Sequence, residues 1–162
     1  MDASESRRPE IASWPEQGVS RVPYWVYSDP DVFSQEMERV FCGDTWNYAA
    51  LTCELAEPGS FKTNFVGNRP VILTRDQDGT LHCFVNRCAH RGVKFCRRAR
   101  GKAKDFICPY HHWAYDLRGN LVGLPFRRGV KRQGGMPADF QREHHGLRKL
   151  KVCERGGVVF VS

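Results

Sequence analysis

Two short segments of the chain each carry one cysteine and one histidine at close spacing. The first is CAHRG, in which one residue separates Cys88 from His90, and the second is CPYHHW, in which two residues separate Cys108 from His111. Seventeen residues lie between His90 and Cys108, so the pairs belong to separate loops. Thiolate sulfur and imidazole nitrogen are common metal ligands. Two matched pairs in glycine- and proline-containing loops therefore indicate a shared metal centre.

Three interpretations of these four side chains are open from the residues alone. The first is buried thiols and ordinary imidazoles without a metal. The second is a structural zinc ion, although zinc fingers usually pair Cys with Cys and His with His. The third is a [2Fe–2S] cluster in which two histidines replace two cysteines on one iron. We favour the third, because each loop can then send its Cys to one iron and its His to the other.

A mixed-ligand cluster of this kind suits electron transfer. With two thiolates in place of four, the oxidised cluster carries no net charge and accepts an electron more easily than an all-cysteine cluster. The electron is expected on the iron held by His90 and His111, whose ligands are less negative. The outer ring nitrogens of both histidines can hydrogen-bond to a partner. The site is therefore predicted to relay single electrons.

The composition is that of a single globular domain. The chain has 162 residues, of which 41% are hydrophobic and 27% are charged. No apolar run reaches the ~20 residues that a membrane span requires, so we expect no membrane association. The N-terminus also lacks the apolar stretch of a secretory signal. The odd number of cysteines, seven, argues against a disulfide framework, and we therefore expect a cytoplasmic protein.

The cysteines outside the two loops are expected to behave as small buried side chains. Among them, Cys96 is predicted to be the most reactive, because it lies in a basic segment near the first loop. The set comprises Cys42, Cys53, Cys83, Cys96 and Cys153.

Basic residues dominate the charge of the chain, which is +7 at neutral pH. They gather in Lys94–Lys104 and in Phe126–Arg132. Both segments lie beside turn residues rather than on a helical face, so solvated basic loops are the simpler interpretation. Docking of an acidic protein is the alternative. We expect no nucleic-acid partner.

One segment, 31–44, has the periodicity of a helix. Asp29 or Asp31 can cap its start. Its apolar stripe is expected to enter the core or to pack against another domain. The stripe consists of Val32, Phe33, Met37, Val40 and Phe41. Residues 1–30 are expected to form an extended N-terminal arm.

Residues 45–162 are expected to form one domain of antiparallel β-strands. Hairpins are predicted where the turn sequences DQDGT, RGN and RGG separate apolar runs. Residues 126–146 are expected to form a long surface loop with a short helical turn. We therefore predict a mainly β fold with a small cluster-binding subdomain, preceded by one helix. The chain stops directly after the strong β run VVFVS, so a longer natural protein is expected.

The two loops resemble the cluster-binding motif of Rieske proteins, and in particular that of the large (alpha) subunit of aromatic-ring-hydroxylating oxygenases. The second loop is similar to that family's Cys-Pro-Tyr-His-x-Trp-x-Tyr pattern from Cys108 to Tyr115. The resemblance implies a Rieske-type [2Fe–2S] cluster, with Cys88 and Cys108 on one iron and the two loop histidines on the other. His112 departs from the family pattern, where a small residue is usual. A shifted register with His112 as the ligand is therefore the alternative.

The resemblance extends from about Arg21 to Ser162. The segment 123–152 looks most like oxygenases that act on aromatic carboxylates such as salicylate, anthranilate or terephthalate. Respiratory Rieske proteins resemble the chain less, because each of their loops carries an additional Cys where Val93 and Tyr110 stand here. A free-standing Rieske ferredoxin is the runner-up, although such ferredoxins are shorter and lack both the helix and the long loop.

The resemblance also implies a catalytic domain that this chain lacks and a set of partner proteins. In this family a C-terminal domain holds a mononuclear non-haem Fe(II) on two His and one carboxylate. The remaining histidines, His82, His112, His144 and His145, do not suit that site, so no catalytic residue is expected in this chain. The implied partners are a ferredoxin or flavin-dependent reductase, the catalytic domain of a neighbouring large subunit and a small beta subunit. The full-length protein is expected to be a trimer-based homo-oligomer.

Overall fold

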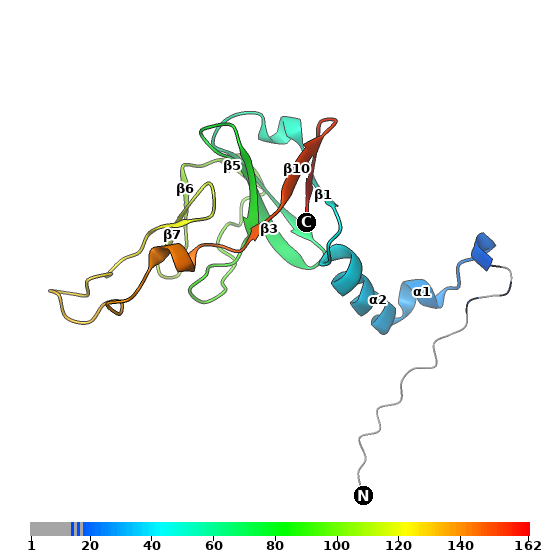
Figure 1. Cartoon of the computed structure of the whole chain (residues 1–162), viewed down its shortest axis with the longest axis horizontal. Helices are drawn as coiled ribbons and strands as arrows, with labels where there is room; N and C mark the ends of the chain where they lie inside the picture. Colours follow the sequence, from blue (N-terminus) through cyan, green and yellow to red (C-terminus); the bar gives the residue numbers. More distant parts are fainter. Residues whose placement is uncertain (1–13, 15, 17) are drawn as a thin grey trace, which may run out of the picture.

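The computed structural model describes Trp14, Glu16 and residues 18–162 (Figure 1). Half of the predicted N-terminal arm therefore lies outside the described residues. The other half is not simply extended, since it contains a 3₁₀ turn, η1, over Gly18–Ser20 and a short helix, α1, over Trp25–Ser28. The ring of Trp14 meets that of Trp25 edge to face at 6.4 Å between centroids, which gives this part of the arm a local apolar contact.

The predicted helix is present, with bounds slightly different from 31–44. Helix α2 spans Pro30–Glu36 and continues as a π-helical turn, η2, over Met37–Phe41. The Asp29 carboxylate accepts hydrogen bonds from two backbone N–H groups of the first turn, at 2.7 and 3.3 Å. This cap and the proline at the first helical position define the start of the helix.

The apolar stripe of this helix does not enter the core of the domain. Phe33 is 59% exposed and Val40 is 48% exposed. Figure 1 shows α1 and α2 projecting to one side of the sheets. Of the two alternatives for the stripe, burial in this domain's core is therefore wrong for these residues.

The described strands form three antiparallel sheets, as predicted for a mainly β fold. The first has the order β1-β11-β10, made of Asn47–Leu51, Val158–Val161 and Val152–Arg155. The second has the order β5-β2-β3-β4-β9, made of Arg100–Lys102, Ser60–Val66, Arg69–Arg75, Leu81–Val85 and Lys149–Leu150. The third has the order β6-β7-β8, made of Asp105–Ile107, Ala114–Asp116 and Leu121–Gly123.

The five-stranded sheet is the middle layer and separates two cores. Its strand β3 is buried on both faces, and consecutive side chains enter different cores. Val71 and Leu73 join an aliphatic core against the first sheet, whereas Ile72 joins an aromatic core against the third. Thr74 faces the third sheet as well, where its hydroxyl donates to the Leu117 carbonyl at 2.5 Å. The third sheet is the small subdomain that the sequence predicted.

Strand β5 was not predicted, because it lies within a segment interpreted as a basic loop. It pairs with β2, and its side chains alternate basic, glycine, basic. A Cβ on Gly101 would approach the Phe61 ring to 3.1 Å, so the half-buried, inward position of this strand takes a residue without a side chain. The strand therefore has no alternation of apolar and polar side chains from which it could have been predicted.

The long loop at 126–146 is present and carries the predicted helical turn, η4, at Arg142–His145. Another 3₁₀ turn, η3, spans Thr52–Leu55. Figure 1 shows the third sheet and this loop on the side opposite to the helices. None of the described helices is long and apolar enough to cross a membrane.

The expectation of buried cysteines is only partly met. Cys83 and Cys96 are buried, but Cys53 and Cys153 are exposed. Cys53 lies in η3 and Cys153 in β10, an edge strand of the first sheet, so neither side chain is covered by a further layer. Cys96 is 8% exposed, and burial raises the pKa of its thiol, which disfavours the reactive thiolate that the sequence suggested there.

Candidate metal centre

The two loops are built on the same hydrogen-bond frame. In loop 1 (Cys88–Val93), the Cys88 N–H donates to the Val93 carbonyl at 2.9 Å and the Cys88 carbonyl accepts from Gly92 at 2.7 Å. In loop 2 (Cys108–Trp113), the first and last residues make the equivalent bond at 2.8 Å, and the Cys108 carbonyl accepts from the fifth residue at 2.9 Å. Each cysteine is therefore the first residue of a hydrogen-bonded turn, which fixes the backbone that carries the loop's histidine.

The fifth residue of each loop has a left-handed backbone. Gly92 has φ of 69° and His112 has φ of 54°. Glycine adopts this conformation at no steric cost, whereas histidine does so under strain. The family pattern's small residue at the fifth position of loop 2 therefore has a physical reason, and His112 is strained at that position.

The structure brings the four predicted side chains together as two pairs. The Cys88 and Cys108 thiols are 3% and 1% exposed, and they are close enough for Cys88 to affect the pKa of Cys108. The rings of His90 and His111 lie 4.7 Å apart between centroids, at 72° to one another. Within the described residues, no three His, Cys, Asp or Glu side chains gather closely enough to bind a single ion. The site thus has a thiol end and an imidazole end.

His90 supplies the most specific sign that these side chains are metal ligands. Its Nδ1 is the one buried side-chain nitrogen or oxygen, among the residues described, that lacks a hydrogen-bond partner. Such atoms are rare in folded proteins, because an unpaired buried polar group is costly. Burial lowers the pKa of His90, and the neighbouring His111 and Arg91 lower it further, so the neutral ring offers a lone pair.

The thiols show the same fit to a metal. Burial raises the pKa of the Cys108 thiol, and the adjacent Cys88 thiol contributes to the rise. The backbone N–H groups of Tyr110 and His111 act in the opposite direction and lower it. The position is therefore one where a thiolate is favoured by nearby donors yet needs a positive charge to offset its burial.

His111, rather than His112, takes part in the imidazole pair. His111 is half-buried and its ring faces His90, whereas His112 is exposed at the strained position. The observed geometry therefore favours the unshifted register.

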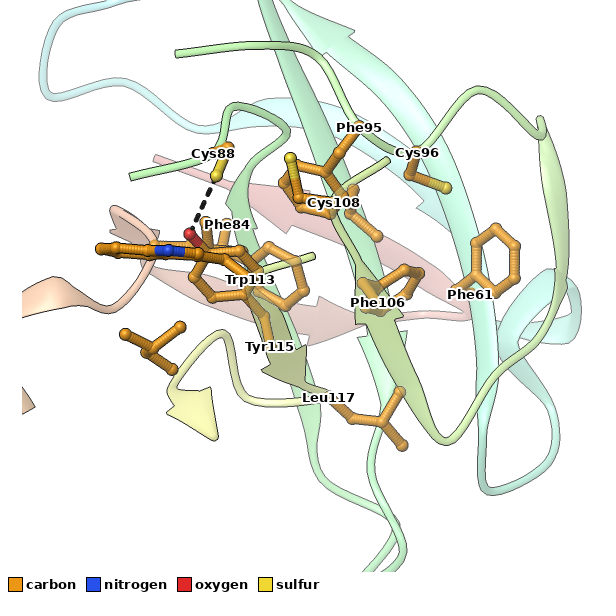
Figure 2. Packing of buried hydrophobic residues seen from close by; sticks show 13 residues of the cluster. Phe61, Phe84, Cys88, Phe95, Cys96, Phe106, Cys108, Trp113, Tyr115 and Leu117 are labelled. Atoms are coloured by element: carbon orange, nitrogen blue, oxygen red, sulfur yellow. Dashed lines mark hydrogen bonds between the residues drawn. The ribbon is translucent and has the colours of Figure 1, made fainter. Parts of the chain in front are cut away.

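Two side chains of the aromatic core contact candidate ligands, one at each end of the site. Trp113 stacks on His90 with an interplanar angle of 8° and a centroid distance of 4.8 Å. The Tyr115 hydroxyl lies 3.2 Å from the Cys88 Sγ (Figure 2). The same hydroxyl accepts a hydrogen bond from the Ala89 N–H at 3.0 Å. Trp113 therefore fixes the plane of one imidazole, and Tyr115 holds loop 1 against the strand that follows loop 2.

Loop 1 has a further support that the sequence did not reveal. Asn86 is fully buried, its Nδ2 donates to the Cys96 carbonyl at 2.7 Å, and its Oδ1 accepts from the Cys96 N–H at 3.0 Å. This pair closes the chain segment that carries loop 1. An asparagine directly after an apolar strand is the only sequence signal, and it is typical of many turns.

A comparison with protein-family models identifies the family of this domain. The model for the Rieske [2Fe-2S] domain matches residues 45–133, more than half of the chain. The chain belongs to the Rieske [2Fe-2S] domain family. The match covers both loops, and it decides between the three interpretations of the loops in favour of the [2Fe–2S] cluster.

Curated relatives carry the resemblance further. The Rieske chain is 52% identical over 158 residues to the large oxygenase component of salicylate 5-hydroxylase from Ralstonia sp, with 95% of this chain and 37% of that protein covered. It is also 52% identical over 149 residues to the anthranilate 1,2-dioxygenase large subunit of Burkholderia cepacia, with 92% of this chain and 35% of that protein covered. The predicted resemblance to salicylate and anthranilate oxygenases is confirmed. The chain spans about a third of the length of these relatives.

A solved structure confirms the Rieske oxygenase fold. Naphthalene 1,2-dioxygenase from Rhodococcus sp., bound to indole, superposes with a TM-score of 0.77 at 31% identity. The superposition covers 87% of this Rieske chain and 31% of that one.

Proposed function

We propose that this Rieske domain is the electron-transfer part of a ring-hydroxylating oxygenase large subunit. Cys88 and Cys108 would bind one iron of the [2Fe–2S] cluster, and His90 and His111 would bind the other. When bound, the cluster supplies a centre that accepts and releases one electron at a time. One observation carries this assignment. The Nδ1 of His90 is buried next to the His111 ring, and it has no hydrogen-bond partner.

The protein's own residues orient and protect this site. Trp113 keeps the His90 ring in one plane by stacking, so that its free nitrogen points in a defined direction. Tyr115 reaches Cys88 and fixes the relative position of the two loops. Both side chains are buried, at 4% and 0% exposure, so Trp113 shields the His90 ring from water and Tyr115 shields the Cys88 thiol. A drier site strengthens the electrostatic effect of the nearby N–H donors.

The wider activity follows from the relatives. We infer that electrons arrive from a ferredoxin or flavin-dependent reductase and leave to a mononuclear iron outside this chain. The substrate class we infer is an aromatic carboxylate, since the salicylate and anthranilate enzymes are named for such compounds. The presence of the α2 helix and of the long loop favours an oxygenase subunit over the shorter free-standing ferredoxin.

A spectroscopic experiment tests the cluster assignment directly. The purified chain should contain iron and acid-labile sulfide in equal amounts, two of each per chain, absorb in the visible range, and give an EPR signal once reduced. Replacement of His90 or His111 by alanine should remove this signal, whereas H112A should keep it. A colourless protein with one zinc ion per chain, or loss of the signal in H112A alone, would contradict the assignment.

A further inference from the structure

A hollow of about 440 Å³ lies beside loop 2, where Pro109 forms part of its wall. Phe95, Phe106 and Pro109 give it apolar walls, and Arg97 and Arg98 line it with positive charge. Both arginine residues are exposed. The hollow therefore combines an apolar surface with a basic edge, a combination typical of protein-docking surfaces.

This hollow is connected to both thiols through a short path. Pro109 directly follows Cys108 in loop 2. The Phe95 ring stacks on Tyr115 at 5.6 Å between centroids, and the Tyr115 hydroxyl lies 3.2 Å from the Cys88 Sγ. Figure 2 shows these side chains within the same aromatic core. A protein seated on the hollow would thus be separated from the Cys88 thiol by the Phe95 and Tyr115 side chains, and it would contact the residue next to Cys108.

The basic charge around the hollow is largely unbalanced. Residues 94–104 contain Lys94, Arg97, Arg98, Arg100, Lys102 and Lys104. Among the ion pairs of the described residues, only that between Lys102 and Glu57 involves this segment. Asp105 is the single acidic residue that lines the hollow. The surface is therefore complementary to an acidic partner.

The imidazole end presents a different chemistry. It borders a hollow of about 410 Å³ whose walls include Pro125, Phe126 and Met136. As far as the chain is described, no Lys, Arg, Asp or Glu lines that hollow. The two ends of the site thus offer two unlike surfaces, one basic and one apolar.

We propose that the surface around Arg97 and Arg98 is the docking site of an acidic iron–sulfur protein that delivers electrons to the thiol end. The proposal rests on the proposed function. One electron passes from the donor, which is oxidised, to this domain, which is reduced, and no bond is made or broken. A second copy of the chain is a poor occupant, because it carries the same +7 charge.

Stopped-flow mixing with a dithionite-reduced plant-type [2Fe–2S] ferredoxin tests this docking site. Cluster-loaded wild type is compared with R97E/R98E, with R97E alone, and with K131E/R132E. The last variant makes the same change in net charge at the tip of the long loop. The single variant R97E covers the case in which R98E disturbs folding, since Arg98 lies over the Phe61 ring at 5.1 Å. Iron content, the EPR spectrum and reduction by dithionite are measured first in every variant.

The expected result is a rate constant for reduction that is about tenfold lower in R97E/R98E at low ionic strength, and severalfold lower in R97E. K131E/R132E should change it by less than about twofold. The dissociation constant for the oxidised ferredoxin, measured by calorimetry, should follow the same order. Equal effects of the two double variants, or a larger effect at the loop tip, would overturn the docking site. A wild type without a cluster would instead refute the proposed function.

Discussion

Loop 1 and loop 2 share one backbone frame but obtain it in different ways. Loop 2 connects β6 to β7, and the pairing of Ile107 with Ala114 closes it directly. Loop 1 follows β4 and is closed by side chains instead, through Asn86, Tyr115 and Arg87, whose guanidinium donates to the Gly92 carbonyl at 3.0 Å. The comparison teaches that the same ligand geometry can depend on a sheet in one loop and on a few buried polar groups in the other.

The largest expected effect is common to both loops. C88S and C108S should each abolish the visible absorbance and the EPR signal of the bound cluster, because serine is a much poorer iron ligand than thiolate. C53S, which changes an exposed cysteine far from the loops in sequence, is the matched control and should keep both signals. Unequal retention of the cluster between C88S and C108S would show that one loop can hold it alone.

A change of Asn86 should distinguish the two loops, because only loop 1 depends on this side chain. N86A leaves the buried N–H and carbonyl of Cys96 without partners, and we expect a loss of about 2–4 kcal/mol in unfolding free energy. Urea denaturation measures this loss. N64A is the control, since Asn64 also donates to a backbone carbonyl but is only partly buried. A cost for N86A no larger than that for N64A would mean that loop 1 does not depend on its side-chain support.

A reference for these effects lies outside both loops, in the β3–β4 turn. The Asp76 carboxylate is 3% exposed and contacts His82 Nε2 at 2.8 Å and Arg118 Nε at 2.9 Å. Burial alone would raise the pKa of Asp76, but hydrogen bonds from His82 and from the backbone N–H groups of Thr80 and Asp78 outweigh it and hold the pKa below its ordinary value of 3.8.

The stabilisation from Asp76 should therefore be full above pH 3.8 and disappear as the pH falls through the lowered pKa. We expect D76N to cost about 1–2 kcal/mol at pH 7, where Asp76 is charged, and progressively less as the pH falls through the lowered pKa. Arg118 is half-exposed and adds little to this cost. Urea denaturation of wild type and variant across this pH range measures the difference. A constant difference at all pH values would exclude the charge of Asp76 as its source.

The smallest expected effects come from the left-handed positions, and they have opposite signs. G92A should destabilise the protein by about 1 kcal/mol through backbone strain alone, because no atom lies within 4 Å of the added Cβ. H112G should stabilise it by about 0.5–1 kcal/mol, since relief of strain exceeds the entropic cost of glycine. Thermal unfolding of both variants provides the measurement, and shifts of the same sign would disprove the equivalence of the two frames.

The sequence predicted the candidate ligands and most strands, for physical reasons that also explain its failures. Cys/His spacing and apolar alternation are local signals, so the candidate ligand pairs and the hairpins could be predicted from the sequence. Strand β5 has glycine at its inward position, and helix α1 lies in a segment without apolar periodicity. The contacts of Asn86 and Tyr115 join residues that are 10 and 26 positions apart or more, and only the folded chain defines them.

Strand β3, which faces a different core with each successive residue, limits how the length of this chain can vary. An insertion or deletion of one residue inside the strand would exchange the two faces for every residue beyond it. Ile72 and Leu73 would then trade places between an aromatic and an aliphatic environment. The loop at 126–146 carries no such parity and can gain or lose residues. Differences in length within this family are therefore expected in the protruding loop and not in the central strand.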